Sequence, residues 1–435
     1  MKHFKFIALF LFFSNLIFSQ EKISLDVSQA IETGLQNSKL LHSSLMKVKA
    51  AESKVKEAIA LRLPSVKLNA RYTRLSKVDP FIISTPFGSF PIAPGIYNNY
   101  ALQLSLAQPL FTGFRLSSNL DLNEKLNDAV NEEYIKDMNE LIFNIKNSYW
   151  NAFKAMQFKK VLDETLLQVE SHLQDAKNLE KVGMMTRNDI LKLEVQLSNV
   201  LYQRAEAENA VHLAMISLNN ILGINLNIEV ELTEKLSYSD WKDEKLDNLI
   251  SKALQDRAEL KAAKARIDAS KAGVTLAQAN WYPQINLYGN YYYSRPNQRI
   301  LPSRDKFDGT WDAGVALSMN LWDWLTTKHQ TDQAEAQLSQ ARDAFDLIRD
   351  GIALDVTANY LNLSQAKNKI DISKLSVEQT EENNKITSAK FKLGLVSSSD
   401  VIDAETALIT AKTNYTNSIV DFELAKAKLE KSIGK

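Results

Sequence analysis

The segment Lys392–Leu408, KLGLVSSSDVIDAETAL, has an earlier counterpart in Lys181–Leu197, KVGMMTRNDILKLEVQL. The two segments begin 211 positions apart, and their Lys, Gly, Asp, Glu and Leu residues recur in register. Because so long a spacing cannot arise from a local periodicity, the match indicates an internal duplication of a supersecondary unit.

Each copy carries the signals of a tight turn between two helices. Gly183 and Gly394 can adopt the left-handed conformation that ends a helix. Three residues after each glycine, a Thr or Ser is followed by an Asp three positions later, which is the spacing of a capping box with an acidic fourth residue. The expected helix caps are Thr186 and Asp189 in the first copy and Ser397 and Asp400 in the second.

The duplication covers nearly the whole chain. Residues 36–68 align with 255–287 at an offset of 219, and from 110–114 and 321–325 onward the offset is 211. Each repeat should contain a helix, a β-hairpin, a very long helix, a turn and a further helix. The predicted segments are a first repeat at 20–222 (hairpin about 64–113, helical tip about 181–189), a connecting segment at 223–245, and a second repeat at 246–435 (hairpin about 283–324, tip about 392–400). Helices are expected near 26–61, 115–181, 187–221, 246–280, 325–391 and 398–432.

The composition excludes several functions. The 52 basic and 52 acidic residues leave no basic excess of the kind that nucleic-acid binding needs. Without cysteine the chain has no thiolate metal site, cysteine nucleophile or lipidated cysteine. The five histidines form no known ligand spacing. We therefore expect no catalytic residue, no metal and no cofactor.

The N-terminus indicates export. MKHFKF is a cationic start and FIALFLFFSNLIF an apolar core, which together predict a signal peptide over residues 1–19. The alternative is an uncleaved membrane anchor, but the apolar run is short for spanning a bilayer. After it, no stretch reaches the roughly 18–20 apolar residues of a membrane helix.

All nine prolines fall in two zones, 64–109 and 283–302. Proline breaks helix interiors, and alternating sequences such as SVKLNARYT and QINLYGNYYY in these zones predict β-hairpins. Alternation over about ten residues is typical of a transmembrane β-barrel, although a soluble sandwich shows the same period. Aromatic residues at strand ends favour the barrel, because they resemble a membrane aromatic girdle. The girdle residues are Trp281, Tyr282, Trp311, Trp322 and Trp324.

The helical segments are too long for a globular core. A helix of about 67 residues would extend about 100 Å at 1.5 Å per residue. The apolar spacing of Leu162, Leu166, Val169, Leu173 and Ala176 predicts a coiled-coil seam. Four strands cannot close a barrel, since about eight are needed, so several chains should contribute to one assembly.

In their order and duplication, these features resemble the TolC family of outer-membrane efflux proteins. The resemblance is carried by ISLDVSQAIETGLQNS, PLFTGF, LNNILGIN and the two tips with Gly, Asp and Glu in register. It implies a mainly α homotrimer, in which an α-helical tunnel through the periplasm continues as a 12-stranded transmembrane β-barrel with four strands per chain. Such a protein is a passive duct of the Gram-negative outer membrane. It would dock through a periplasmic adaptor (membrane fusion protein) to an inner-membrane pump or to the ABC transporter of a type I secretion system.

The resemblance also implies roles for the tips. In the family, a Val/Leu-Gly-Leu turn meets the adaptor, and the matching residues here are Val182, Gly183 and Met184 and, in the second repeat, Leu393, Gly394 and Leu395. A helix-ending glycine would explain the two glycines equally well, but not their apolar neighbours.

Asp400 and Asp403, three residues apart, lie on one helix face. The resemblance implies that this pair lines the periplasmic entrance, where three chains would present a ring of carboxylates that attracts cations. Helix capping is an alternative role for Asp400, as it is for Asp189. Capping does not explain Asp403, whose counterpart in the first repeat is Lys192.

Two positions depart from the family pattern. Where the best-known pattern has a Tyr and an Arg that help to close the entrance, this chain has Phe391 and Val396, which cannot form the same polar links.

Two other classes of function remain as alternatives: a periplasmic coiled-coil scaffold or adaptor without a pore, and an enzyme using Asp400 and Asp403 as an acid–base pair. The enzyme has no supporting nucleophile or histidine partner.

Overall fold

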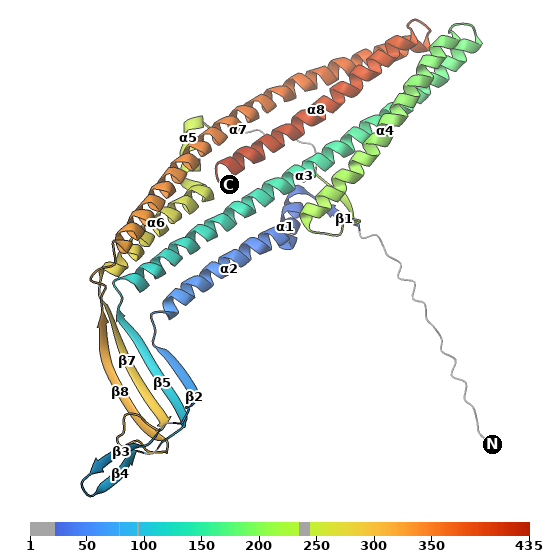
Figure 1. The fold of residues 1–435 in the computed structure, drawn as a ribbon. Helices are drawn as coiled ribbons and strands as arrows, with labels where there is room; N and C mark the ends of the chain where they lie inside the picture. Colours follow the sequence, from blue (N-terminus) through green and yellow to red (C-terminus); the bar gives the residue numbers. More distant parts are fainter. Residues whose placement is uncertain (1–21, 78, 94, 235–243) are drawn as a thin grey trace, which may run out of the picture.

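The computed structural model describes residues 22–77, 79–93, 95–234 and 244–435. The expected signal peptide lies outside these residues. The molecule is an elongated arm of helices with a twisted sheet at one end (Figure 1). Within the described residues, no helix combines the length and the hydropathy needed to cross a membrane.

Two helical hairpins form the arm. In the first, α3 (Arg115–Lys181) is followed by α4 (Arg187–Leu222), and in the second, α7 (Thr326–Lys392) by α8 (Ser398–Ser432). The long helices α3 and α7 both have 67 residues and start beside the sheet, so their far ends lie about 100 Å away at 1.5 Å per residue. Both hairpin turns therefore lie together at the end of the molecule opposite the sheet (Figure 1).

The prediction of one continuous helix at the start of each repeat was wrong. The first repeat has α1 (Val27–Asn37) and α2 (Lys39–Ala60), and the second has α5 (Leu246–Asp256) and α6 (Ala258–Gln278). The breaks fall at Ser38 and Arg257, which are equivalent at the 219-residue offset and have nearly the same extended backbone. Ser38 accepts a hydrogen bond from Leu41 N, whereas Arg257 is held by Glu259 and by Asp355 of α7, both at 2.8 Å.

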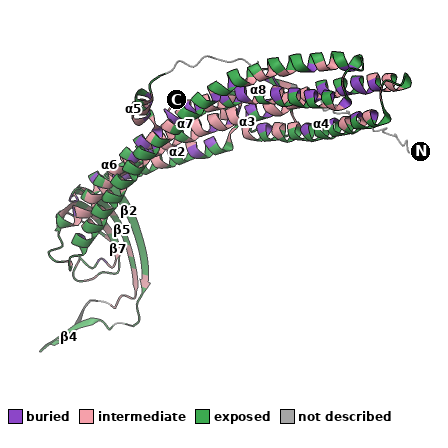
Figure 2. Ribbon diagram, turned by 90° about the horizontal axis from the view of Figure 1, so that it is seen from above, coloured by how far each residue is buried: buried purple, intermediate pink, exposed green. Residues whose placement is uncertain are grey.

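The helices pack side by side in the order α2, α3, α6, α7. Buried residues form stripes along the facing sides of the helices, while much of the outer surface is exposed (Figure 2). The predicted coiled-coil seam is largely confirmed, because Leu162, Val169, Leu173 and Ala176 are buried. Leu166 is half-buried.

The sheet at the base contains both hairpins. Its strands are β2 (Ser65–Arg74), β5 (Asn98–Phe111), β7 (Gln284–Arg295) and β8 (Asp308–Ser318), all antiparallel and in the order β2-β5-β7-β8. The two hairpins share one register: Val66 opposes Leu106 in the first, and the equivalent residues Ile285 and Leu317 oppose each other in the second. Strands β2 and β8 are the edges, and neither has a partner on its outer side among the described residues.

The segment between β2 and β5 contains a further hairpin. Strands β3 (Phe81–Thr85) and β4 (Gly88–Ala93) pair with each other and extend beyond the end of the sheet (Figure 1). The sequence signals of this hairpin were obscured by four prolines within fifteen residues, from Pro80 to Pro94.

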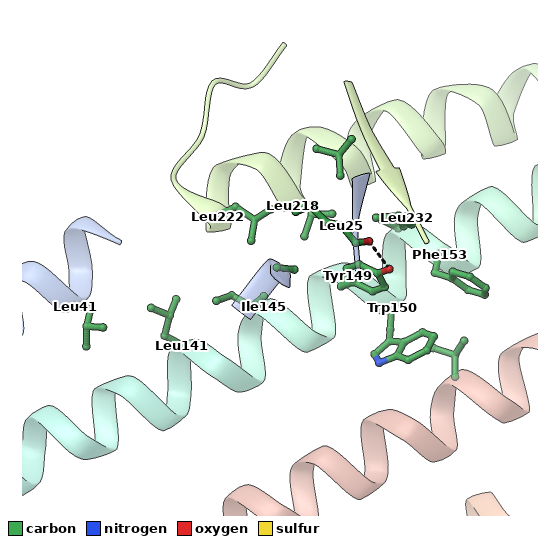
Figure 3. Packing of buried hydrophobic residues seen from close by; sticks show 14 residues of the cluster. Leu25, Leu41, Leu141, Ile145, Tyr149, Trp150, Phe153, Leu218, Leu222 and Leu232 are labelled. Carbon is green, nitrogen blue, oxygen red and sulfur yellow. Dashed lines mark hydrogen bonds between the residues drawn. The ribbon is translucent and has the colours of Figure 1, made fainter. Parts of the chain in front are cut away.

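The largest apolar core lies at mid-length of the arm, where α1, α3 and α4 meet a two-stranded parallel sheet of β1 (Lys22–Leu25) and β6 (Glu229–Leu232). Tyr149 is fully buried there and donates a hydrogen bond to Leu25 O at 3.0 Å (Figure 3). The Tyr149 hydroxyl also accepts one from Glu234 N at 3.2 Å. This tyrosine thus connects strand β1 to the segment after β6, two parts that are distant in sequence.

Candidate functional site

The two helical tips are side by side and apolar. Gly183 and Gly394 have left-handed φ values of 75° and 72°, as each turn requires. Met184 Cε lies only 3.0 Å from where a Cβ on Gly394 would be, so the turns touch. The four large side chains that flank the glycines are all between 58% and 68% exposed. They are Val182, Met184, Leu393 and Leu395.

Both expected capping boxes are present. Thr186 Oγ1 accepts from Asp189 N at 3.3 Å, and the Asp189 carboxylate accepts from Thr186 N at 3.3 Å. In the second tip, Asp400 Oδ2 accepts from Ser397 N at 2.8 Å and from Ser397 Oγ at 2.7 Å. These hydrogen bonds from Ser397 hold the pKa of the exposed Asp400 carboxyl below its usual value. Asp400 is therefore an ionised cap.

Asp403 is placed differently. It lines an open groove between α4 and α8 together with Lys192, its counterpart in the first repeat. Lys192 Nζ donates to Ser399 Oγ of α8 at 3.1 Å. Within the described residues, the Asp403 side chain has no hydrogen bond or ion pair, so its carboxylate faces solvent. The structure thus places Asp400 and Asp403 on neighbouring exposed positions of α8, as the sequence predicts, but gives them different surroundings.

Phe391 and Val396 lie inside the tip rather than at its surface. Phe391 is fully buried in an apolar cluster that joins all four helices of the two hairpins, and Val396 packs against that cluster. The ring of Phe391 meets the His172 ring edge-on at 5.6 Å. The two residues that interrupt the family pattern therefore contribute apolar packing between the hairpins.

The aromatic residues lie at two levels of the sheet. Trp281, Tyr282, Trp322 and Trp324 are exposed where the strands meet the helices, although none of them lies within a strand. Trp311 lies on β8 towards the other end, opposite Tyr291. Three further exposed tyrosines belong to this second level and were not among the predicted girdle residues: Tyr72, Tyr100 and Tyr293. Their positions near the outer ends of β2, β5 and β7 were the available signal.

Metal chemistry finds no support in the part of the chain that is described, since no group of three His, Asp or Glu side chains there could hold an ion. The exposed tips, the sheet with two open edges and the helical arm are the features that a function must explain.

Comparison with known proteins identifies the arrangement. A family model described as outer membrane efflux protein matches residues 30–224 and 249–435. The chain belongs to the outer membrane efflux protein family. This efflux protein is 24% identical to the outer membrane protein TolC of Vibrio cholerae over 316 residues, which is 72% of each chain. It is also 24% identical to the protein CyaE of Bordetella pertussis over 341 residues, 78% of this chain and 69% of CyaE.

Solved structures show the same fold. The outer membrane protein VceC of Vibrio cholerae matches with a TM-score of 0.77 and 18% identity, over 94% of this chain and 96% of VceC. The CmeC outer membrane channel of Campylobacter jejuni matches with a TM-score of 0.78 and 15% identity, over 94% of this chain and 85% of CmeC.

The predicted fold class, family and function are confirmed. The efflux protein is an outer-membrane channel-tunnel for efflux or secretion, located in the Gram-negative outer membrane with a helical tunnel in the periplasm. The family consists of channel proteins, and its members act as trimeric channels with adaptor and inner-membrane pump partners. The channel function also explains why the sheet and the helical tips lie at opposite ends of the molecule.

Proposed function

We propose that three copies of this chain form one tunnel, whose tips dock a periplasmic adaptor and receive substrates from an inner-membrane pump or ABC transporter. Each repeat, 20–222 and 246–435, would supply one sixth of the tube, and no catalytic step or cofactor is part of the proposal. The observation that carries it is the contact between the two repeats inside the chain: β5 pairs with β7, and α3 packs against α6.

That contact can be repeated between copies. The equivalents of β5 and α3 in the second repeat are β8 and α7, and the equivalents of β7 and α6 in the first repeat are β2 and α2. These equivalents lie on opposite edges of the chain. If β8 and α7 of one copy meet β2 and α2 of the next, three copies supply twelve strands and leave no open edge.

Exposed apolar side chains on both helical edges support this arrangement. On α7, Leu347, Leu354 and Leu361 are seven residues apart and all exposed. A seven-residue spacing keeps side chains on one helix face, as in a coiled coil. On α2, Leu40 and Ile59 are exposed as well. Exposure of apolar surface to water is unfavourable, and packing against a second copy would bury these side chains.

The tips suit docking of a partner. The exposed side chains of Val182, Met184, Leu393 and Leu395 form an uncharged patch across two adjacent turns. Because a helix-ending turn needs only the glycine, the apolar neighbours are left free for binding, and we assign them to the adaptor. Three chains would present six such turns at the periplasmic end.

Asp400 and Asp403 would line the entrance between the tips. Six carboxylates around a narrow opening attract cations and resist anions. Asp400 combines this role with helix capping, whereas Asp403 makes no capping contact and Lys192 stands at its position in the first repeat. The asymmetry favours an entrance formed mainly by α8.

Single-channel recording in planar bilayers tests the entrance. The wild-type channel should be cation-selective, and Asp403→Asn should lower the ratio of cation to anion permeability, most clearly at low salt because salt screens exposed charges. Asp189→Asn is the matched control, since it removes the charge of the residue equivalent to Asp400 in the first tip and should leave selectivity unchanged. If cation selectivity is unchanged when Asp403→Asn and Asp400→Asn are combined, the two aspartates do not line the entrance, and their role is structural.

A further inference from the structure

A buried acid–imidazole pair joins the two helical hairpins just below the tips. Glu405 of α8 is 1% exposed, and His172 of α3 is also buried. His172 Nε2 lies 3.4 Å from Glu405 Oε1. The same nitrogen lies 3.3 Å from Ser388 Oγ of α7, so His172 connects the first hairpin to both helices of the second.

The duplication shows how unusual this pair is. The counterpart of Glu405 in the first repeat is Glu194, which is half-exposed and lies 3.7 Å from Lys177 Nζ and 3.8 Å from Arg187 Nη2. Those contacts stay within one hairpin. At the position of Lys177 the second repeat has Ser388, which carries no charge, and Glu405 instead faces His172 across the two hairpins.

Few other groups form hydrogen bonds with the side chains of this pair. Neither Glu405 oxygen has a hydrogen-bond partner within accepted geometry in the described structure, and His172 Nδ1 has none either. The Phe391 ring covers His172 edge-on. The charged groups acting on His172 are Asp175 of α3 and Lys392 of α7, and they oppose each other. On α4, Lys192 is engaged with Ser399.

We propose that the His172–Glu405 pair holds the second helical hairpin against the first in the closed entrance, and that loss of the proton shared by the pair above neutral pH releases the hairpin. This inference rests on the proposed placing of the tips at the tunnel entrance. The buried His172–Glu405 pair would take the place of polar links at the surface of the entrance, which Phe391 and Val396 cannot form.

The chemistry of the pair predicts in which direction pH changes the contact between the hairpins. Burial raises the pKa of Glu405 to about 7. Burial also lowers the pKa of His172, so both residues favour their neutral forms. With one proton between them, Glu405 can donate to His172 Nε2, and no net charge is buried. Above pH 7 the carboxylate would be buried beside a neutral imidazole, which is unfavourable, because a buried charge needs a partner.

Single-channel conductance at pH 6.5 and pH 8.5 tests the inference. A carboxyl group with a pKa of about 7 is about three-quarters protonated at the lower pH and about 3% protonated at the higher. The wild-type open probability should therefore rise severalfold between them. Glu405→Gln keeps a donor for His172 at any pH, so it should abolish the rise. Glu194→Gln, the equivalent change in the first repeat, should leave the rise intact.

Hydrogen exchange of residues 385–410, compared with 175–200 in the same sample, reports the hairpin contact without relying on conduction. The second hairpin should lose protection relative to the first at pH 8.5 in the wild type and keep it in Glu405→Gln. Equal behaviour of wild type and Glu405→Gln in exchange would overturn the inference. An exchange difference without any conductance difference would show that the contact is real but does not lie at the entrance, which would overturn the gating role and the proposed placing of the tips.

Discussion

Gly113 and Trp324 occupy the same position in the two repeats, 211 residues apart, and both adopt a left-handed backbone, with φ of 63° and 55°. Each is followed by a second left-handed residue, Phe114 or Leu325, at the turn from sheet to helix. A left-handed tryptophan is rare, since only glycine adopts this conformation without strain. The two positions differ in their neighbours. Gly113 packs tightly against the segment Ala279–Tyr282, whereas Trp324 is exposed at the lateral edge of the molecule, next to the edge strand β8.

Gly113→Ala should therefore destabilise the protein. A Cβ at this position would lie 2.4 Å from Ala279 O and 2.7 Å from Tyr282 Cβ, and the backbone conformation is unfavourable for alanine. We expect a loss of about 2–4 kcal/mol in the free energy of unfolding, from overpacking and backbone strain together. Gly273→Ala, within helix α6, should instead stabilise by about 0.5–1 kcal/mol, because its Cβ would make only an ordinary contact of 3.6 Å with Leu122 Cδ1. Denaturant unfolding in detergent measures both, and a neutral Gly113→Ala would contradict the tight packing.

The duplication predicts the strand register between copies. Leu106 of β5 opposes Gly289 of β7. Their equivalents are Leu317 of β8 and Ala70 of β2, which should face each other across the boundary between two chains.

Cysteine cross-linking measures this register, and the chain has no cysteine of its own. Ala70→Cys with Leu317→Cys should form a disulfide that links three chains into a covalent ring, visible on a non-reducing gel. Ala70→Cys with Ala313→Cys is the control, since it is displaced by four residues, or about 13 Å, which is too far for a disulfide. More cross-linking in the control than in the matched pair would mean that the register between copies differs from the one within the chain.

Polar substitution at the tips should block adaptor docking without unfolding the channel. Val182→Ser with Met184→Ser, and Leu393→Ser with Leu395→Ser, remove exposed side chains that the fold itself does not bury. Because surface changes of this kind usually alter stability by no more than about 0.5 kcal/mol, the melting temperature should stay nearly the same. Export of substrate and capture of the cognate adaptor should both fall. Leu201→Ser, exposed on α4 away from the tips, is the control. Normal export by the tip variants would exclude this docking surface.

Glu405 should make stability depend on pH. Its pKa is raised from 4.5 to about 7 in the folded protein, so its stabilising effect is complete below pH 4.5 and is lost as the pH rises through 7. The loss is about 3 kcal/mol, from 1.36 kcal/mol for each pKa unit. Glu405→Gln should thus be more stable than wild type at pH 8, and the difference should shrink at pH 5. Thermal unfolding followed by circular dichroism at the two pH values measures this. A difference that is the same at both would show that the carboxyl does not titrate in this range.

Local sequence signals predicted a large part of the structure. The glycines and capping residues of Lys181–Leu197 and Lys392–Leu408 fixed both tips, because a helix end depends on residues within one turn. The proline zones and alternating segments located the four main strands. The spacing of Asp400 and Asp403 also placed both residues on one face of a helix.

Other features depended on contacts between distant residues. The helix break at Arg257 has no local cap and is held in part by Asp355, 98 residues later. The burial of Phe391 and the pairing of His172 with Glu405 arise where four helices meet.

The sequence by itself determined the duplicated unit, its turns and its family, since these are written in short-range patterns and in their repetition. Only the tertiary structure decided which of two equivalent residues is buried. Glu194 and Glu405 have the same position in their repeats, yet one lies among lysine and arginine at the surface and the other against a histidine in the interior. The physical reason is that burial and the pKa of a side chain depend on what the neighbouring helices bring to it, which a repeat of the local sequence does not specify.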